Sequence, residues 1–201
     1  MTTEFRIART EDVPGILAIY APFCESTEVS FETEAPSESQ MRDRIEKVLQ
    51  QFPWLVCEID GEVAGYVYAN QHRERAAYRW AVDTAVYIAA KHRRRSLGRA
   101  LYASLFAILR QQGYFKAYAS ITLPNSSSVG LHEAVGFRPE AVFPGVGYKR
   151  GRWLDVGWWH LELQPSVTDP PEPQSFNRLD REAVSAALAA GEALLPHKKQ
   201  A

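Results

Sequence analysis

The chain has 201 residues, of which 46% are hydrophobic, and its formal net charge is −1 at pH 7. This length suits one domain with a sizeable core, and a nearly neutral chain has no global field that would attract nucleic acid or an anionic membrane. No apolar run approaches the roughly 18–20 residues of a membrane span, and the first residues show no apolar signal core. We therefore expect a cytoplasmic protein that binds neither nucleic acid nor membrane, with Cys24 and Cys57 as reduced thiols.

The N-terminal quarter predicts one strand and two helices. Residues 5–8 alternate as a short strand does. Thr10 is expected to be the N-cap of a first helix that runs to about Cys24. Ser37 and Gln40 have the spacing of a capping box, which predicts the start of a second helix. The apolar residues of that helix form one stripe: Met41, Ile45, Val48 and Leu49.

The middle of the chain predicts a hairpin, a third strand and a long helix. Asp60-Gly61 joins two apolar runs, and this dipeptide is the strongest short signal for a β-hairpin. Residues 83–89 form another strand-like run. The segment from Leu97 is helical, because leucine and isoleucine recur on one face, and Gly113 closes it. The residues of that face are Leu97, Leu101, Leu105 and Ile108.

Residues 116–123 predict a further strand. Asn125 then caps a short helix that ends at Gly136, and the last two strands surround a turn at Lys149–Arg152. The resulting order is β-α-α-β-β-β-α-β-α-β-β. It predicts a mixed α/β (α+β) domain over residues 1–164, with a strand–helix–strand unit in its middle.

The composition changes at Pro165. Residues 164–174 hold four prolines, so we expect an extended linker there. Residues 180–195 are rich in alanine and leucine and could form one amphipathic helix. Two alternatives stay open for this tail, residues 165–201: a frayed end, or a helix docked on the body or on a second subunit.

Five basic or titratable residues in a row, 91–95, stand between a predicted strand and a predicted helix. The first backbone N–H groups of a helix lack internal partners, and the helix dipole adds partial positive charge, so this junction can hold an anion. Gly98 allows a ligand or a neighbouring backbone to come close. Neither the Gly-x-Gly-x-x-Gly loop of dinucleotide folds nor a Walker loop occurs. The alternative is a solvated basic turn.

The array Arg93-x-x-Ser96-x-Gly98-Arg99 resembles the (Gln/Arg)-x-x-Gly-x-(Gly/Ala) loop of the GNAT superfamily of N-acetyltransferases. Within that superfamily the chain is most similar to the phosphinothricin / methionine sulfoximine N-acetyltransferase group. The resemblance covers residues 4–163, and its most specific part is "LPNSSSVGLHEAVGF" followed by "GYKRGRWLDVGWW". It implies the GNAT acyltransferase fold, a mixed splayed sheet flanked by helices.

The resemblance implies acetyl-CoA as the co-substrate and no metal. The pyrophosphate would lie on the loop Arg94–Arg99, and the pantetheine arm would pair with residues 86–88 like an added strand. Asn125 matches the asparagine that bonds the pantetheine, a role that is compatible with helix capping. The implied cofactor-binding residues are Val86, Tyr87, Ile88, Arg93, Arg94, Arg95, Ser96, Leu97, Gly98, Arg99 and Asn125.

Acetyl transfer from a thioester to an amine needs a base for the amine and a donor for the thioester oxygen. Asp83 matches a glutamate that is the family's proposed general base, and because aspartate is one methylene shorter we expect it to act through water. His132 matches the general acid toward the sulfur, and histidine titrates near neutral pH. The oxyanion donor is expected to be a backbone N–H within residues 86–88. The alternatives are a surface carboxylate for Asp83 and a core histidine bonded to backbone for His132.

The resemblance also implies a site for the acceptor. Arg75 matches the substrate-side arginine, whose guanidinium can bind a carboxylate or phosphinate through two parallel hydrogen bonds, and Arg73 is a second candidate. Phe31 and Tyr78 could wall the pocket, with ordinary core packing as the alternative. The implied substrate-binding residues are Phe31, Arg73, Glu74, Arg75, Tyr78, Asp83, Thr84 and Ala85.

The last two strands hold Trp153, Trp158 and Trp159, which is more aromatic surface than one small core requires. Aromatic residues are enriched at interfaces, and the resemblance implies a homodimer. The alternative is that all three tryptophans belong to the core.

Ser96 departs from the family pattern, which has glycine at this position. If the φ of Ser96 is positive, serine is strained there. If its φ is ordinary, the hydroxyl of Ser96 can cap the helix. We expect the second arrangement, because a helix start suits serine and Gly98 can absorb the close approach.

The resemblance leads us to expect an acetyl-CoA-dependent N-acetyltransferase that acetylates the amino group of a small amino acid analogue, such as phosphinothricin or methionine sulfoximine. One alternative keeps the fold and changes the acceptor to another small amine, amino acid or antibiotic. In another class, the basic run could bind nucleic acid or an acidic partner, although no stacking aromatics accompany it. A catalytically dead acetyl-CoA sensor is the last alternative.

Overall fold

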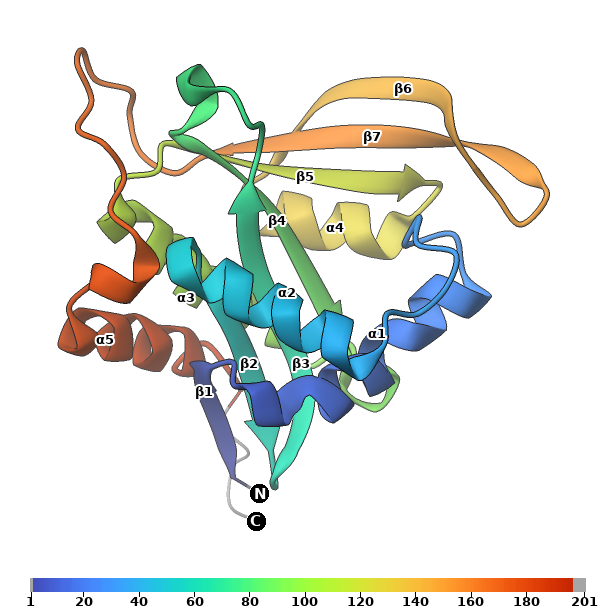
Figure 1. Cartoon of the computed structure of the whole chain (residues 1–201), viewed down its shortest axis with the longest axis horizontal. Helices are drawn as coiled ribbons and strands as arrows, with labels where there is room; N and C mark the ends of the chain where they lie inside the picture. Colours follow the sequence, from blue (N-terminus) through green and yellow to red (C-terminus); the bar gives the residue numbers. More distant parts are fainter. Residues whose placement is uncertain (1, 197–201) are drawn as a thin grey trace.

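The computed structural model describes residues 2–196, which form a seven-stranded sheet in the order β1-β2-β3-β4-β5-β7-β6 (Figure 1). All neighbouring strands are antiparallel except β4 and β5, which are parallel. The predicted order of elements and the mixed fold class are confirmed. The strands are β1 (Thr3–Ile7), β2 (Trp54–Ile59), β3 (Glu62–Gln71), β4 (Ala81–Ile88), β5 (Lys116–Leu123), β6 (Arg138–Lys149) and β7 (Arg152–Glu162).

Helices cover both faces of the sheet (Figure 1). One pair packs on β2 and β3 through the buried side chains of Trp54, Val56 and Tyr66. Another lies on the opposite face together with the core around Leu55 and Val82. None of the helices within residues 2–196 is long and apolar enough to cross a membrane. The first pair is α1 (Val13–Ser26) and α2 (Glu38–Gln51), the second is α3 (Leu97–Gln112) and α5 (Arg181–Glu192), and the short helix is α4 (Ser126–Ala134).

Local sequence signals explain most element boundaries. At the start of α2, the Ser37 hydroxyl accepts a hydrogen bond from the Gln40 N–H, and the Gln40 side chain accepts from the Ser37 N–H, which confirms the capping box. Asp60 and Gly61 both have positive φ, 50° and 84°, as the tight turn of a hairpin requires. Gly113 ends α3 in the left-handed conformation.

The start of the first helix differs from the prediction. Thr10 is not an N-cap, because it lies inside a 3₁₀ turn, Thr10–Asp12, that precedes α1. The Asp12 carboxylate accepts from the backbone N–H of Arg9 at 2.7 Å and pairs with Arg6 at 2.6 Å. Asp12 therefore closes the 3₁₀ turn by accepting from the residue before it, the salt bridge holds it in place, and α1 begins without a side-chain cap.

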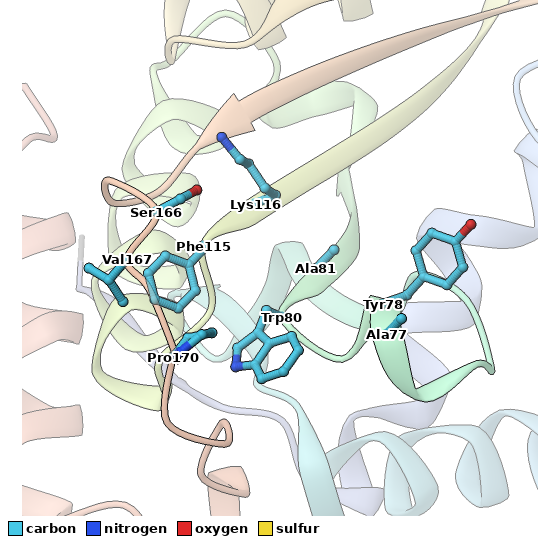
Figure 2. Close-up of a pocket in the computed structure, with 9 residues that line it drawn as sticks. All are labelled: Ala77, Tyr78, Trp80, Ala81, Phe115, Lys116, Ser166, Val167 and Pro170. Atoms are coloured by element: carbon cyan, nitrogen blue, oxygen red, sulfur yellow. The ribbon is translucent and has the colours of Figure 1, made fainter.

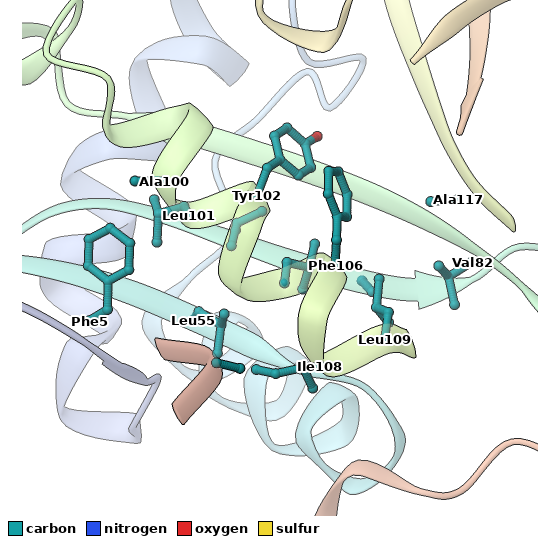
Figure 3. Packing of buried hydrophobic residues seen from close by; sticks show 14 of the residues in the cluster. Phe5, Leu55, Val82, Ala100, Leu101, Tyr102, Phe106, Ile108, Leu109 and Ala117 are labelled. Carbon is teal, nitrogen blue, oxygen red and sulfur yellow. The ribbon is translucent and has the colours of Figure 1, made fainter. Parts of the chain in front are cut away.

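The largest part of the core lies between α3 and the sheet (Figure 3). The predicted face of α3 is confirmed, since Leu101, Leu105 and Ile108 are fully buried. Burying a side chain of this size stabilises a fold by roughly 1.5–3 kcal/mol, so this face anchors α3 to the sheet.

The tail packs on the body. Val184 and Ala187 of α5 belong to the main core. Gly191 lies where an added Cβ would meet the Ser104 hydroxyl and the Ala100 carbonyl, so the absence of a side chain allows α5 to cross α3 closely. The last part of the predicted tail, residues 197–201, and residue 1 lie outside the described residues.

The three tryptophans of the last strands differ in their environments. Trp159 is buried, Trp158 is half-buried and Trp153 is 68% exposed. The alternative that all three belong to the core is therefore wrong.

β4 and β5 are paired only where they begin. Their register joins Ala81 to Lys116, Val82 to Ala117 and Asp83 to Tyr118, and no pair follows within the described chain. β4 continues along β3, while β5 continues along β7, so the two strands diverge after Asp83 (Figure 1). From residue 84 to residue 88, the edge of β4 that faces β5 is thus left without a strand partner.

Lys149, at the end of β6, is buried against the loop between α1 and α2. Its ammonium donates to the carbonyls of Cys24 at 2.5 Å, Ser30 at 2.6 Å and Glu32 at 2.8 Å. An ammonium has three N–H donors, and a cation suits the C-terminal end of a helix such as α1. One side chain of the last hairpin therefore holds both the end of α1 and the loop that follows it.

We predict that Lys149→Met lowers the free energy of unfolding by at least about 2 kcal/mol, because each buried carbonyl left without a donor costs about 1–3 kcal/mol. Urea titration measures this change. Arg152→Met is the matched control, since Arg152 is exposed and pairs with Glu28 at the surface, where ion pairs contribute little. If the two variants unfold at the same urea concentration, Lys149 does not hold the loop.

Candidate active site

A hollow of about 280 Å³ opens where β4 and β5 part. Its walls come from β3, β4, β5, β7 and the loop between α1 and α2, so elements far apart in the sequence meet there. The lining residues are Val29, Ser30, Phe31, Tyr68, Asn70, Asp83, Thr84, Ala85, Tyr87, Ser120, Thr122 and Val156.

Several residues predicted from the sequence meet in this hollow. Asp83, Thr84, Ala85 and Tyr87 line it from β4, and Phe31 lines it from the loop. The ring of Phe31 lies against Gly147 of β6, so close that any Cβ at this glycine would collide with it. The loop that Lys149 holds therefore contributes one wall.

The segment from Arg73 to Tyr78 lies outside this lining. Arg73 places its guanidinium over the ring of Trp158, 5.6 Å from the centroid, and Glu74 and Arg75 are exposed. Tyr78 lines a second, mostly apolar hollow of about 220 Å³, in which its hydroxyl points away from Trp80 (Figure 2). The acceptor roles of these four residues stay predictions.

Asp83 makes a short contact that was not predicted from the sequence. Its Oδ1 lies 2.6 Å from Nδ1 of His72, whose ring stacks on Tyr118 with 4.4 Å between centroids. Burial raises the pKa of Asp83, whereas the hydrogen bond and the charge of His72 lower it. The register of β3 and β4 could have indicated His72. Asn70 is paired with Asp83, and His72, two positions after Asn70, lies diagonally opposite Asp83 on the same face of the sheet.

His132 is buried on α4, with both ring nitrogens engaged. Nδ1 lies 2.7 Å from the Ser128 carbonyl, so it donates, and Nε2 then accepts from the Tyr102 hydroxyl at 2.8 Å. Burial lowers the pKa of His132, which favours the neutral ring, although the hydrogen bond to the Ser128 backbone acts in the opposite direction. Tyr102, which the sequence reading did not single out, also lies 3.5 Å from the hydroxyl of Thr84. This is the arrangement of a core histidine bonded to backbone, and the role of His132 as an acid stays a prediction.

The basic residues before and at the start of α3 fall into two groups, those that contact another side chain and those that are exposed without an ion-pair partner in the described chain. Lys91 forms an ion pair with Glu62, and His92 is buried. Arg93 lies over the ring of Phe23, 5.3 Å from its centroid. The remaining arginines are exposed and have no ion-pair partner within residues 2–196: Arg94, Arg95 and Arg99.

Ser96 does not cap α3, so the expectation for this residue is wrong. Its φ is 63° and its ψ is 4°, which is the left-handed conformation, and its side chain makes no capping hydrogen bond. Arg94 also has a positive φ, 60°. The chain thus enters the helix through two left-handed residues, and a serine hydroxyl in that geometry does not meet the helical N–H groups.

Gly98 and Asn125 have clear structural roles beside the loop. An added Cβ at Gly98 would lie 2.8 Å from the Leu131 side chain, so the glycine lets α4 approach the start of α3. The group that approaches Gly98 is thus the side chain of Leu131 and not a neighbouring backbone. Asn125 accepts from the Ser128 N–H at 3.1 Å, which confirms it as the cap of α4. Capping occupies the side-chain oxygen and leaves the amide group available as a donor.

Known proteins share this architecture. Residues 5–158 match the family model for the acetyltransferase (GNAT) domain. A phosphinothricin N-acetyltransferase of Streptomyces viridochromogenes is 37% identical over 170 residues, or 85% of this chain and 92% of that protein. An L-methionine sulfoximine/L-methionine sulfone acetyltransferase of Pseudomonas paraeruginosa is 34% identical over 173 residues, or 85% and 100%. Among solved structures, a GNAT superfamily phosphinothricin acetyltransferase from Sinorhizobium meliloti in complex with AcCoA has a TM-score of 0.81, at 31% identity over 86% of this chain and 95% of that one.

The left-handed conformation of Ser96 leads to a stability prediction. Ser96→Gly should raise the free energy of unfolding by about 1 kcal/mol. A Cβ in this conformation costs about 1–2 kcal/mol, and the greater entropy of glycine in the unfolded chain offsets part of the gain from removing it. Ser127→Gly, at an exposed position in the first turn of α4, is the control and should lose up to about 0.5 kcal/mol, because glycine is a poorer helix former than serine. Denaturant titration compares the two. A loss of stability in both variants would mean that Ser96 is not strained.

Proposed function

Because the chain belongs to the acetyltransferase (GNAT) family, we propose that it transfers acetyl from acetyl-CoA to the amino group of a small amino acid analogue such as phosphinothricin or methionine sulfoximine. The observation that carries this proposal is the position of Asp83, which lines the hollow at the point where β4 and β5 part. A carboxylate that can serve as a base thus lies beside an open strand edge. The named acceptors are those of relatives that are 37% and 34% identical over most of the chain.

The residues at the open edge fit acetyl-CoA. Arg94, Arg95 and Arg99 are exposed at the N-terminal end of α3, where helix N–H groups and guanidinium groups both favour phosphate oxygens. The unpaired edge of β4 over residues 84–88 offers backbone partners to an extended pantetheine arm. The amide of Asn125, at the start of α4, is available to donate to that arm. When bound, acetyl-CoA supplies the activated acetyl group as a thioester.

Proton removal from the acceptor is the task of Asp83. An ammonium is not a nucleophile, so the acceptor amine must lose a proton before it attacks the thioester. The carboxylate of Asp83 takes this proton, through a water because aspartate is short. A backbone N–H within residues 86–88 would stabilise the negative charge that develops on the thioester oxygen.

Arg73 and Arg75 would bind the carboxylate of the acceptor. The guanidinium of Arg73 lies over Trp158 of β7, close enough to Asp83 for its charge to lower the pKa of that carboxyl group. A guanidinium binds a carboxylate through two parallel hydrogen bonds. Arg75 directly precedes the 3₁₀ turn Ala76–Tyr78 and is exposed, so its guanidinium is accessible to an acceptor. This clamp selects amino acid analogues over simple amines.

Thiol release from acetyl-CoA tests the function. We expect release with phosphinothricin or methionine sulfoximine and a much lower rate with amines that lack a carboxylate. Asp83→Asn should lower kcat by about 10²–10⁴-fold, and the wild-type rate should rise with pH and level off once Asp83 is deprotonated. Asp43→Asn, on the exposed face of α2, is the control.

Each result has a definite meaning. If acetyl-CoA raises Tm but no acceptor in a broad panel of amino acids, amines and antibiotics releases thiol, the chain is a sensor and the proposed reaction is wrong. If amines without a carboxylate react equally well, the arginine clamp is wrong and another small amine is the acceptor. If Asp83→Asn keeps its kcat, another group is the base.

We also propose a homodimer and a cytoplasmic location. Both cysteines within the described residues are unpaired and buried, as in proteins of a reducing compartment, and cell fractionation tests this location. For the dimer, the supporting feature is a patch of exposed apolar side chains on the edge hairpin, which marks interaction surfaces in soluble proteins. The patch consists of Val142, Phe143, Val146, Tyr148 and Trp153.

The dimer is tested by changing this patch. Val146→Lys combined with Trp153→Lys should convert a dimer into a monomer in sedimentation velocity, because two buried charges without partners would oppose association. Leu194→Lys, which alters another exposed apolar residue, should leave the mass unchanged. A wild-type protein that sediments as a monomer at all concentrations would contradict the proposal.

A further inference from the structure

We propose that His72 is a positioning residue for acetyl transfer: its Nδ1–H holds one carboxylate oxygen of Asp83, so that the other oxygen faces the hollow and takes the acceptor's proton. This proposal rests on the proposed function, in which Asp83 is the base. It adds a second residue, with the role of orienting the base and keeping it ionised.

The ring of His72 is held on three sides by aromatic side chains. It stacks on Tyr118 of β5 with an interplanar angle of 17°, and it meets the edges of Trp158 at 5.9 Å and Tyr78 at 6.0 Å. Its side chain is 11% exposed, against 36% for Asp83. This packing fixes the plane of the ring, and the contact with Asp83 brings Nδ1 to the carboxylate.

The direction of the hydrogen bond follows from the state of the carboxylate. Asp83 must be ionised to act as a base, and an ionised carboxylate has only acceptors. The proton in the 2.6 Å contact therefore belongs to Nδ1 of His72, and the contact is a charge-assisted hydrogen bond. Because Oδ1 is occupied, Oδ2 is the oxygen left for the acceptor. Asp83 lines the hollow and His72 does not, which fits an orienting residue behind a reacting one.

His72 also counteracts the burial of Asp83. Burial raises the pKa of this carboxyl group, whereas His72 lowers it through both its hydrogen bond and its charge, and Arg73 lowers it through its charge. Without His72 the carboxyl group of Asp83 would keep its proton up to a higher pH, and it could not act as a base until that pH was reached. The other titratable or charged side chains that face the pair are Tyr68 on β3, Tyr78 in the 3₁₀ turn, Tyr118 on β5 and, beyond Tyr118, His160 with Glu140 on β7 and β6.

Two substitutions separate the hydrogen bond from the packing. His72→Phe keeps a ring that can stack on Tyr118 and removes the donor. His72→Asn removes the ring but keeps an amide N–H near the position of Nδ1. We expect His72→Phe to lower kcat by at least tenfold with the KM for acetyl-CoA within twofold of wild type, and His72→Asn to recover most of the loss.

The pH profile distinguishes a positioning role from a structural one. In His72→Phe the rise of kcat/KM should move to higher pH, because a cause that lowers the pKa of Asp83 has been removed. His160→Phe, which alters the other histidine near Tyr118, should leave the profile in place. An unchanged profile in His72→Phe would overturn the proposal, and so would a rise that moves to lower pH, since His72 itself would then be the base.

A spectroscopic measurement tests the pair without the reaction. In ¹⁵N spectra of the free protein above neutral pH, His72 should show the Nδ1–H tautomer, and Asp83→Asn should weaken this preference. If His72 shows the Nε2–H tautomer in the wild type, the proposal is wrong, whether or not any variant folds. If the tautomer is as expected but wild-type protein releases no thiol with any acceptor, the proposed function fails while the pair stands.

Discussion

The parting of two parallel strands is the constraint on which this molecule depends. β4 and β5 share three register pairs and then follow different partners. β4 keeps its backbone hydrogen bonds to β3, and β5 keeps its bonds to β7. The backbone groups that lose their strand partners therefore lie on one edge of β4, where they face an opening. The hollow, Asp83 and the basic start of α3 all border this opening. A sheet that stayed closed over its full length would have no place for them.

Helix packing keeps the opening fixed. α3 connects the far end of β4 to the beginning of β5, and α4 follows directly after β5. The two helices touch where Leu131 lies against Gly98, which has no side chain in the way. The start of α3 and the end of β5 are therefore held at a set distance. The left-handed residues Arg94 and Ser96 let the chain turn into α3 at the position that this contact demands, so local backbone strain there follows from the tertiary arrangement.

Local signals made much of the fold predictable from the sequence, and long-range contacts made the rest inaccessible. The capping box at Ser37 and the turn at Asp60-Gly61 involve residues within a few positions of each other, and both occur as expected. The capping roles expected of Ser96 and Thr10 are wrong, because a residue suited to capping does so only if the chain arrives with the right backbone angles and at the right position. Ser96 is left-handed, and Thr10 lies inside a 3₁₀ turn. Asp83 could be found by resemblance, but its partner His72 depends on the register of two strands. Lys149 depends on contacts with residues more than a hundred positions away, which no local pattern reveals.

The buried ammonium of Lys149 imposes an order on folding. The end of α1 and the loop that carries Ser30 and Phe31 belong to the first sixth of the chain, yet their carbonyls find their donor in the turn region of the last hairpin. A chain made from its N-terminus can form α1 early, but it must close a loop of more than a hundred residues before this contact exists, and such closure is slow. The wall of the hollow that Phe31 provides is thus not fixed until β6 has been made, and a chain interrupted before β6 would hold Asp83 and the basic start of α3 beside an unfinished wall.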